Sequence, residues 1–176
     1  MAATQEFERL IQPCLNAGYN LARWLLADDA AAEDALQEAS LRAFSYLGGL
    51  SGSDARPWFL KIVRNTCYSH LTRHGARSEH HGFDEEELGH MQFAQGQFSD
   101  DPAQALELRQ KRHAIDMAIA ALPAPMREVI VLRELEGLEY KDISHIAGIP
   151  MGTVMSRLSR AREQLRSALT RQGLLE

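Results

Sequence analysis

Small polar and cationic side chains near the C-terminus have the types and spacing to contact DNA. Residues 151–166 read MGTVMSRLSRAREQLR. If this segment is helical, one side of it carries Thr153, Met155, Ser156, Ser159 and Arg160, with Arg157 and Arg162 at the edges. Arginine can bind a guanine edge with two hydrogen bonds, and serine can bind bases or phosphates. The set predicts a helix that enters the major groove of DNA.

The apolar residues of the same segment indicate how that helix is held. They recur at intervals of four, three and four, and they are Val154, Leu158, Ala161 and Leu165. A shorter helical pattern over 139–147 precedes them, and the residues at 148–150, Gly-Ile-Pro, form a turn. This arrangement predicts a helix-turn-helix. An ordinary helical hairpin with a solvated basic face is the alternative.

A second set of candidate residues lies in the segment 34–44, DALQEASLRAF. Because of their three- and four-residue spacing, one helical face carries Asp34, Gln37, Glu38 and Leu41. By itself, such a face is typical of a solvated acidic stripe on an amphipathic helix.

Helices must position both sets, and helical periodicity extends through most of the chain. No alternating run of Val, Ile, Thr and aromatic residues indicates a strand. Helical spacing is found over 7–15 and 21–25. We expect further helices over about 32–47, 57–73, 103–121, 125–136, 139–147 and 151–170. The predicted fold class is all-α.

Charge and composition divide the chain into three parts. The net charge is −5, and residues 73–105 hold two Arg against seven acidic residues, including Asp84–Glu87. Glycines are scattered through this stretch and periodicity fades, which is typical of a linker. We therefore expect two small helical domains, residues 1–73 and 106–176, joined by a flexible acidic linker over 74–105. Because the protein is acidic overall, we expect any DNA contact to use one local face.

The composition also limits where the protein works and what it can bind. No apolar run approaches the roughly 18 residues of a membrane helix, and the N-terminus lacks the apolar core of a secretory signal. Cys14 and Cys67 are the only cysteines and lie on apolar stripes, so we expect buried, inert thiols in the cytoplasm. A redox-sensing role for them is the alternative.

The C-terminal pattern resembles a known family. The helix-turn-helix segment and the preceding residues 121–144, ALPAPMREVIVLRELEGLEYKDIS, are similar to region four of bacterial sigma factors, most closely the extracytoplasmic-function (ECF) type. The resemblance implies that the second helix binds the minus-thirty-five promoter element and that the earlier helices contact the flap of the polymerase β subunit. The family often has a basic residue where this chain has Met155.

The N-terminal half resembles region two of the same family. The resemblance implies that the face with Asp34 and Glu38 binds the clamp helices of the polymerase β′ subunit. Residues 54–71, DARPWFLKIVRNTCYSHL, resemble the part that melts and reads the minus-ten element. Opened DNA needs aromatic surfaces, polar groups and cations, and the side chains that supply them are Trp58, Arg64, Asn65, Tyr68 and Arg73.

The family analogy refines these roles. It places Asn65 at the edge of the duplex and makes 50–56 the pocket for an extruded base. We expect Trp58 and Phe59 to pack mainly in the core.

The resemblance therefore predicts an alternative sigma factor that is not an enzyme. Its expected partners are core RNA polymerase, promoter DNA and an anti-sigma factor, with no small-molecule substrate and no membrane insertion. The linker of about 32 residues could span roughly 100 Å when extended. The two promoter elements are about 70 Å apart if two helical turns separate them, so one molecule could reach both. Its acidic cluster suggests a path through a positively charged channel.

Two other classes of function are possible from the residues alone. A stand-alone helix-turn-helix regulator would use residues 139–170 but would leave the segment 34–44 and residues 64–71 without a role. An enzyme or metal protein could use the acidic linker and the histidines His70, His74, His80 and His81. No HExxH, GxxxxGK[ST], GxSxG or GxGxxG motif is present, so we expect no metal and no cofactor.

Overall fold

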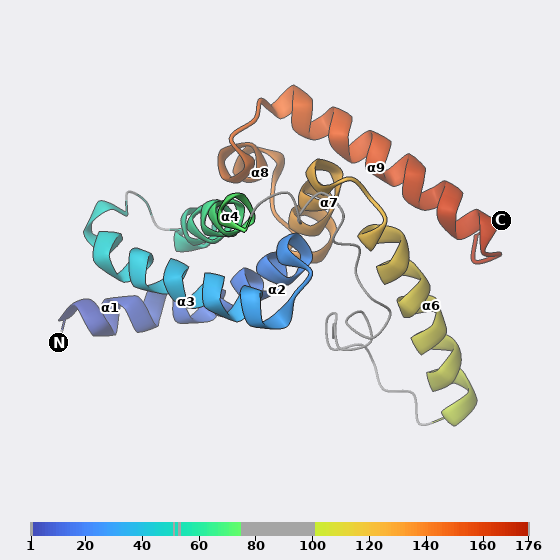
Figure 1. Ribbon diagram of the computed structural model, residues 1–176, viewed down its shortest axis with the longest axis horizontal. Coiled ribbons are helices and arrows are strands. Elements are labelled where there is room, and N and C mark those ends of the chain that lie inside the picture. The colour runs from blue at the N-terminus through green and yellow to red at the C-terminus, as the bar shows by residue number, and fades with distance from the viewer. Residues whose placement is uncertain (1, 51, 53, 75–100, 176) are drawn as a thin grey trace.

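The computed structural model describes residues 2–50, 52, 54–74 and 101–175, and within these residues the chain forms helices and no strand (Figure 1). The predicted all-α fold class is confirmed. No helix in the described part combines the length and the apolar character needed to cross a membrane. The proposed linker falls mostly outside the described residues, and its acidic cluster Asp84–Glu87 lies entirely outside them.

The N-terminal unit, residues 2–74, is built from four α-helices with short 3₁₀ turns. They are α1 (Ala2–Leu10), η1 (Gln12–Cys14), α2 (Leu15–Leu26), α3 (Asp29–Tyr46), η2 (Leu47–Gly49) and α4 (Ala55–Arg73). Helices α2, α3 and α4 pack against one another, and α1 lies along α3 (Figure 1). Asp28 and Asp54 begin α3 and α4 by accepting backbone hydrogen bonds, at 2.7 and 3.0 Å, in the first turn.

The C-terminal unit, residues 101–175, continues with helices only. They are α6 (Pro102–Ala120), α7 (Ala124–Ile130), the π-helix η4 (Val131–Leu135), α8 (Tyr140–Ala147) and α9 (Met151–Arg171). The sequence predicts one helix over 125–136, whereas the structure changes from α-helix to π-helix at Val131. Gly137 and Gly148 follow η4 and α8 with φ of 67° and 65°, a conformation that favours glycine.

Small residues allow the N-terminal helices to pack closely. On the side of α3 that faces α2 and α4, buried alanines recur every three or four residues: Ala32, Ala35, Ala39 and Ala43. Gly18 of α2 lies so near α4 that a Cβ atom there would be 2.9 Å from the Phe59 ring and 3.0 Å from Leu36. The three-helix contact therefore depends on the absence of a side chain at position 18.

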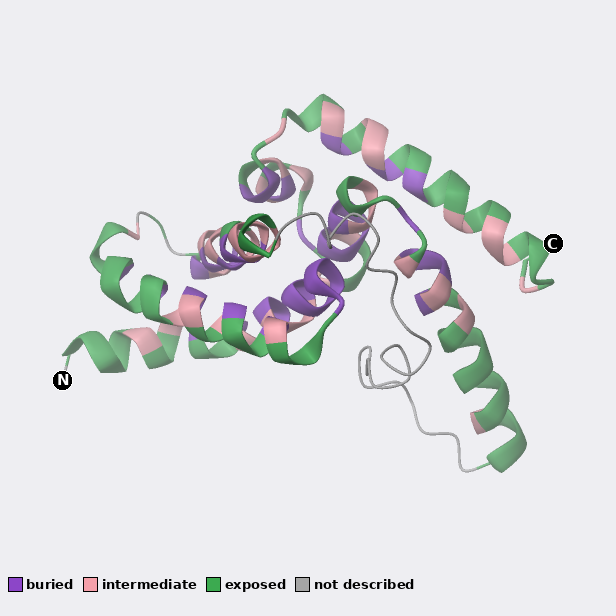
Figure 2. Cartoon of the chain, viewed as in Figure 1, coloured by how far each residue is buried: buried purple, intermediate pink, exposed green. Residues whose placement is uncertain are grey.

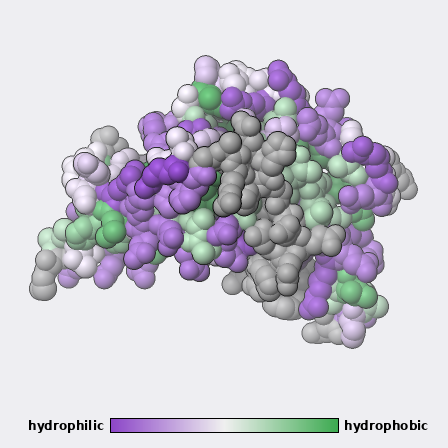
Figure 3. Space-filling model, in the orientation of Figure 1, coloured by the Kyte–Doolittle hydropathy of each residue, from purple (hydrophilic) through white to green (hydrophobic). Residues whose placement is uncertain are grey.

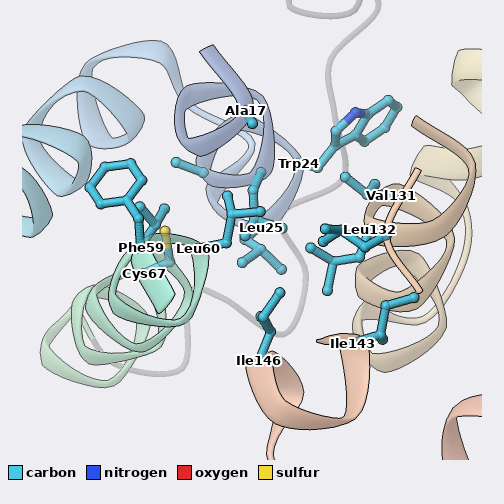
Figure 4. Packing of buried hydrophobic residues seen from close by; sticks show 14 of the residues in the cluster. Ala17, Trp24, Leu25, Phe59, Leu60, Cys67, Val131, Leu132, Ile143 and Ile146 are labelled. Atoms are coloured by element: carbon cyan, nitrogen blue, oxygen red, sulfur yellow. The ribbon is translucent and has the colours of Figure 1, made fainter. Parts of the chain in front are cut away.

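The two units share one hydrophobic core. Figure 4 shows Leu25 of α2 and Leu60 of α4 pointing toward Leu132 of η4 and Ile146 of α8, and these side chains belong to one buried cluster. The buried faces of α2, α4, α7 and α8 meet at the centre of the molecule, whereas the N-terminal part of α6 is exposed (Figure 2). The sequence predicts two helical units, and the structure adds that they pack directly against each other.

Substituting Gly18 with valine should destabilise the protein. The added methyl groups overlap the fully buried Phe59, and overpacking of this kind costs about 1–3 kcal/mol. The matched control is Gly152→Val in α9, where nothing beyond the chain neighbours and the backbone of the same helix lies within 4 Å of the added Cβ position. Urea denaturation measures both free energies of unfolding, and equal losses in the two variants would contradict the close approach at Gly18.

Asp116 of α6 is a buried carboxyl group, 9% exposed, with Arg112 as the nearby cation. Burial raises its pKa to about 7, although Arg112 acts in the opposite direction. In the unfolded chain the same carboxyl ionises near pH 4. Stability is therefore unaffected by this group below about pH 4, falls as the pH rises toward 7, and then levels off.

Asp116→Asn should remove this pH dependence. From pH 4.5 to pH 7.5 the variant should gain about 1–2 kcal/mol relative to the wild type, allowing for solvent near the carboxyl group. Urea denaturation at several pH values gives the difference in the free energy of unfolding. A difference that stays constant between these pH values would show that Asp116 ionises normally in the folded protein.

Candidate functional site

Helices α8 and α9 form the helix-turn-helix that the sequence predicts. Ile143 and Ile146 of α8 are buried, as are Val154 and Leu158 of α9. The turn is fixed by Gly148 and by a 2.6 Å hydrogen bond that the Ser144 hydroxyl donates to the Ile149 carbonyl. The apolar sides therefore face inward and leave the opposite side of α9 outside.

The predicted DNA-reading residues lie on the outer side of α9. Met155, Ser159 and Arg160 are exposed, and the side chain at 155 is 48% accessible. Thr153, Ser156 and Arg157 are half-buried, and the Ser156 hydroxyl bonds the Thr153 carbonyl at 3.1 Å. The exposed residues could reach base edges, while the half-buried ones lie at the margin of that surface.

Arg162, which the sequence places at the edge of this set, is held by Glu134 of η4. The two nitrogen–oxygen distances are 3.0 and 2.6 Å. This contact is the main reason why the pKa of Arg162 lies above its ordinary value. Arg162 therefore ties α9 to the helix beneath it.

The predicted minus-ten residues lie along α4. Phe59 is fully buried and Trp58 is half-buried and packed against the core, so the core role expected for both is confirmed. Asn65 is exposed, whereas Arg64 and Tyr68 are half-buried. Arg64 and Tyr68 also touch each other, because the guanidinium lies 4.0 Å from the centre of the ring.

A carboxylate from the C-terminal unit is hydrogen-bonded to both Arg64 and Tyr68. Glu128 of α7 is 1% exposed and accepts a 2.6 Å hydrogen bond from Arg64 and a 3.3 Å bond from the Tyr68 hydroxyl. Burial alone would lower the pKa of Arg64, but the contact with Glu128 outweighs it and raises the pKa. Burial, followed by the charge of Glu128, raises the pKa of Tyr68. The three groups form a hydrogen-bonded cluster between the units, and Glu128 is its buried member.

A second contact of the same kind lies beside the first. Glu136, which follows η4, accepts hydrogen bonds from Arg56 at 2.8 Å and from Asn20 at 2.6 Å. Arg127 reinforces the junction by donating to the Trp24 carbonyl at 3.1 Å. Asn20, Arg127, Glu128 and Glu136 are site residues that sequence reasoning missed. The available signal was an acid at position 128 beside the apolar run Val-Ile-Val-Leu.

The predicted polymerase-binding face lies on the outer side of α3. Asp34, Gln37 and Leu41 are exposed, and Leu41 is 66% accessible. Glu38 is half-buried because it is bonded to Arg42 of α3 and to His70 and Arg73 of α4. The bond from His70, followed by the two arginines, holds the pKa of Glu38 below its ordinary value.

Exposed apolar side chains extend this face. Phe44 is 44% accessible and Tyr46 is 69% accessible, and Phe44 packs edge-on against Phe7 of α1 with ring centres 5.6 Å apart. Figure 3 shows hydrophobic surface at this end of α1 and α3. An apolar centre bordered by charges is typical of a protein-binding surface.

The histidines and the two cysteines are the residues of the alternative metal and redox sites. Within the described residues, no three His, Cys, Asp or Glu side chains come together as metal ligands. The rings of His70 and His74 stack 6.1 Å apart, and the other two histidines of the predicted cluster lie outside the described residues. Cys14 and Cys67 are buried, as expected, and burial raises the pKa of Cys67 to about 12.

Two family profiles match the chain. The profile of sigma-70 region 2 matches residues 10–77, and that of sigma-70 region 4 matches residues 112–165. The RNA polymerase sigma-H factor of Pseudomonas aeruginosa is 33% identical over 147 residues, which cover 81% of this chain and 75% of the relative. The ECF RNA polymerase sigma-E factor of Escherichia coli K12 is 33% identical over 135 residues, covering 75% and 70%.

A solved structure has a similar fold over nearly the whole chain. It is the sigma factor RpoE in complex with the anti-sigma factor NepR from Bartonella quintana. The TM-score is 0.70 at 26% identity, and the alignment covers 94% of this chain and 98% of the other.

Proposed function

We propose which surface of this chain binds which partner. The chain belongs to the ECF group of the sigma-70 family of RNA polymerase sigma factors. As an alternative sigma factor it directs the initiation of transcription. The chain itself acts by binding, whereas RNA polymerase catalyses the reaction, in the cytoplasm. The observation that carries the proposal is that one chain matches both region 2 and region 4 and presents exposed faces on α3 and α9.

The face of α3 with Asp34, Gln37, Glu38 and Leu41 binds the clamp of the polymerase β′ subunit. Glu38 is held in position by its bonds to Arg42, His70 and Arg73, which fix the orientation of its side chain within this face. The exposed Leu41 supplies apolar surface that contact with a partner would remove from water.

Two surfaces contact promoter DNA. Arg64, Asn65, Tyr68 and Arg73 of α4 hold the opened minus-ten element, and the outer side of α9 reads the minus-thirty-five element. The proposed domains are residues 1–73 and 106–176, with 74–105 as the linker between them and the helices before α8 on the β flap. An anti-sigma factor is a further proposed partner, because the similar RpoE structure contains one.

A stand-alone regulator is the less favoured function. It would need the helix-turn-helix alone and would give no role to region 2, which is matched over residues 10–77.

The double change Asp34→Lys and Leu41→Ala should weaken binding to core polymerase at least tenfold. Both side chains are exposed, so the fold should survive and helix content should stay the same. The charge-matched control is Glu163→Lys, on an exposed part of α9. Fluorescence anisotropy with core enzyme and no DNA measures the affinity. Wild-type affinity in the double variant would exclude the α3 face as the docking surface.

Changes on the outer side of α9 should act on promoter binding by the holoenzyme. Arg160→Ala should cost about 1–3 kcal/mol if Arg160 binds a base. Met155→Lys should raise affinity across many promoters and steepen the salt dependence by about 1 log unit per log unit, because it adds a cation near the phosphates.

Arg171→Ala, at the far end of α9, is the matched control and should leave both quantities unchanged. Filter binding at several salt concentrations gives affinity and slope together. If Met155→Lys behaves like this control, position 155 does not face DNA.

A further inference from the structure

The two arginines of α4 nearest the C-terminal unit are already bonded to carboxylates. Arg64 holds Glu128 at 2.6 Å and Arg56 holds Glu136 at 2.8 Å. The acids are well enclosed, with side-chain exposures of 1% and 10%. Charges this far from water must be matched by charges in fixed positions.

The spacing of the two contacts is the same on both sides. Arg56 and Arg64 are eight residues apart, and so are Glu128 and Glu136. The order is reversed, because the start of α4 meets the end of η4 while the middle of α4 meets α7. Eight residues correspond to roughly 12 Å along a helix. The C-terminal unit therefore presents a short row of negative charges along α4.

A nucleic-acid backbone presents negative charges in a similar way. Arginine binds carboxylate and phosphate oxygens with the same planar donor group. Proteins hold single-stranded DNA with cationic and aromatic side chains, and on α4 the guanidinium of Arg64 lies over the ring of Tyr68. Glu128 and Glu136 are thus bonded to side chains of α4 of the kinds that bind opened DNA.

We infer that Glu128 and Glu136 are an intramolecular substitute for the phosphates of opened promoter DNA. The substitute keeps the surface of α4 closed in the free protein. DNA and the C-terminal unit compete for Arg56 and Arg64, so the two units must separate before the minus-ten strand can bind. The inference rests on the proposed function, which places that strand on α4.

Closure reduces the apparent affinity of the free chain for DNA. A ligand that binds only the open state is weakened in proportion to the fraction of open molecules. Asn65 is exposed, and the side chains of Arg56 and Arg64 keep 38% and 21% of their surface, so the closed state occupies the charges of the two arginines rather than hiding α4. Neutral glutamines at 128 and 136 could not balance the two arginines and would favour separation.

The test uses the full chain and a fluorescent single-stranded DNA of mixed sequence. The double variant Glu128→Gln, Glu136→Gln should bind this DNA at least tenfold more tightly than the wild type at low salt. Its salt slope should steepen by about 1.4, because two more cations contact phosphates. Equal affinity and slope in the folded double variant and the wild type would overturn the inference.

The double change Glu6→Gln, Glu8→Gln is the matched control. It removes the same number of charges from exposed positions of α1, a helix that is part of neither the junction between the units nor a proposed DNA surface. Its affinity should stay within about twofold of the wild type. An equal gain in this control would mean that net charge alone improves DNA binding, and it would overturn the inference.

Two further variants keep the test decisive. If the double variant does not fold, Glu136→Gln alone, at the less buried contact, should show a slope increase of about 0.7. Adding Arg56→Ala and Arg64→Ala to the glutamine background should abolish the gain. A gain that persists would place the DNA elsewhere and would overturn the inference.

Promoter opening by the holoenzyme separates this inference from the proposed function. If Arg56→Ala with Arg64→Ala slows opening while the glutamine variants gain no affinity, α4 is a DNA surface and the closure is wrong. If the arginine variants open promoters normally, the minus-ten assignment itself is wrong.

Discussion

A buried carboxylate links the two units of the molecule. Glu128 is 1% exposed; its charge is balanced by Arg64, and Tyr68 donates a second hydrogen bond to it, although both partners lie 60 or more residues away in the chain. An uncompensated charge in such a place would cost about 3–5 kcal/mol. The ion pair between α7 and α4 is therefore coupled to the packing of the two units, which share an apolar core.

The same coupling links stability to function. The side chains of α4 that stabilise the junction are those proposed to hold opened DNA, whereas the outer sides of α3 and α9 point away from it and are exposed. Polymerase and duplex DNA could thus meet accessible faces first, and the surface for single-stranded DNA would become available only as the units part. A factor built in this way would bind promoters efficiently only within the holoenzyme.

Much of this structure could be predicted from local pattern. The alanine stripe of α3 predicts which side of that helix is buried. Gly148 and the apolar spacing of Val154 and Leu158 predict the helix-turn-helix. Periodicity defines which side of a helix is buried but not which distant helix covers it, so the contact between Arg64 and Glu128 could not be predicted. Local propensity also does not distinguish an α-helix from the π-helix at Val131.

The separation of the two units can be measured directly. Exposed residues outside the proposed surfaces, Asn16 of α2 and Thr170 of α9, can be changed to cysteine and labelled, because Cys14 and Cys67 are buried. Energy transfer between the dyes then reports the distance between the units in the free chain and in the promoter complex with polymerase. The account predicts one short distance in the free chain and a distance tens of ångströms longer in the complex. The same distance in both states would contradict it.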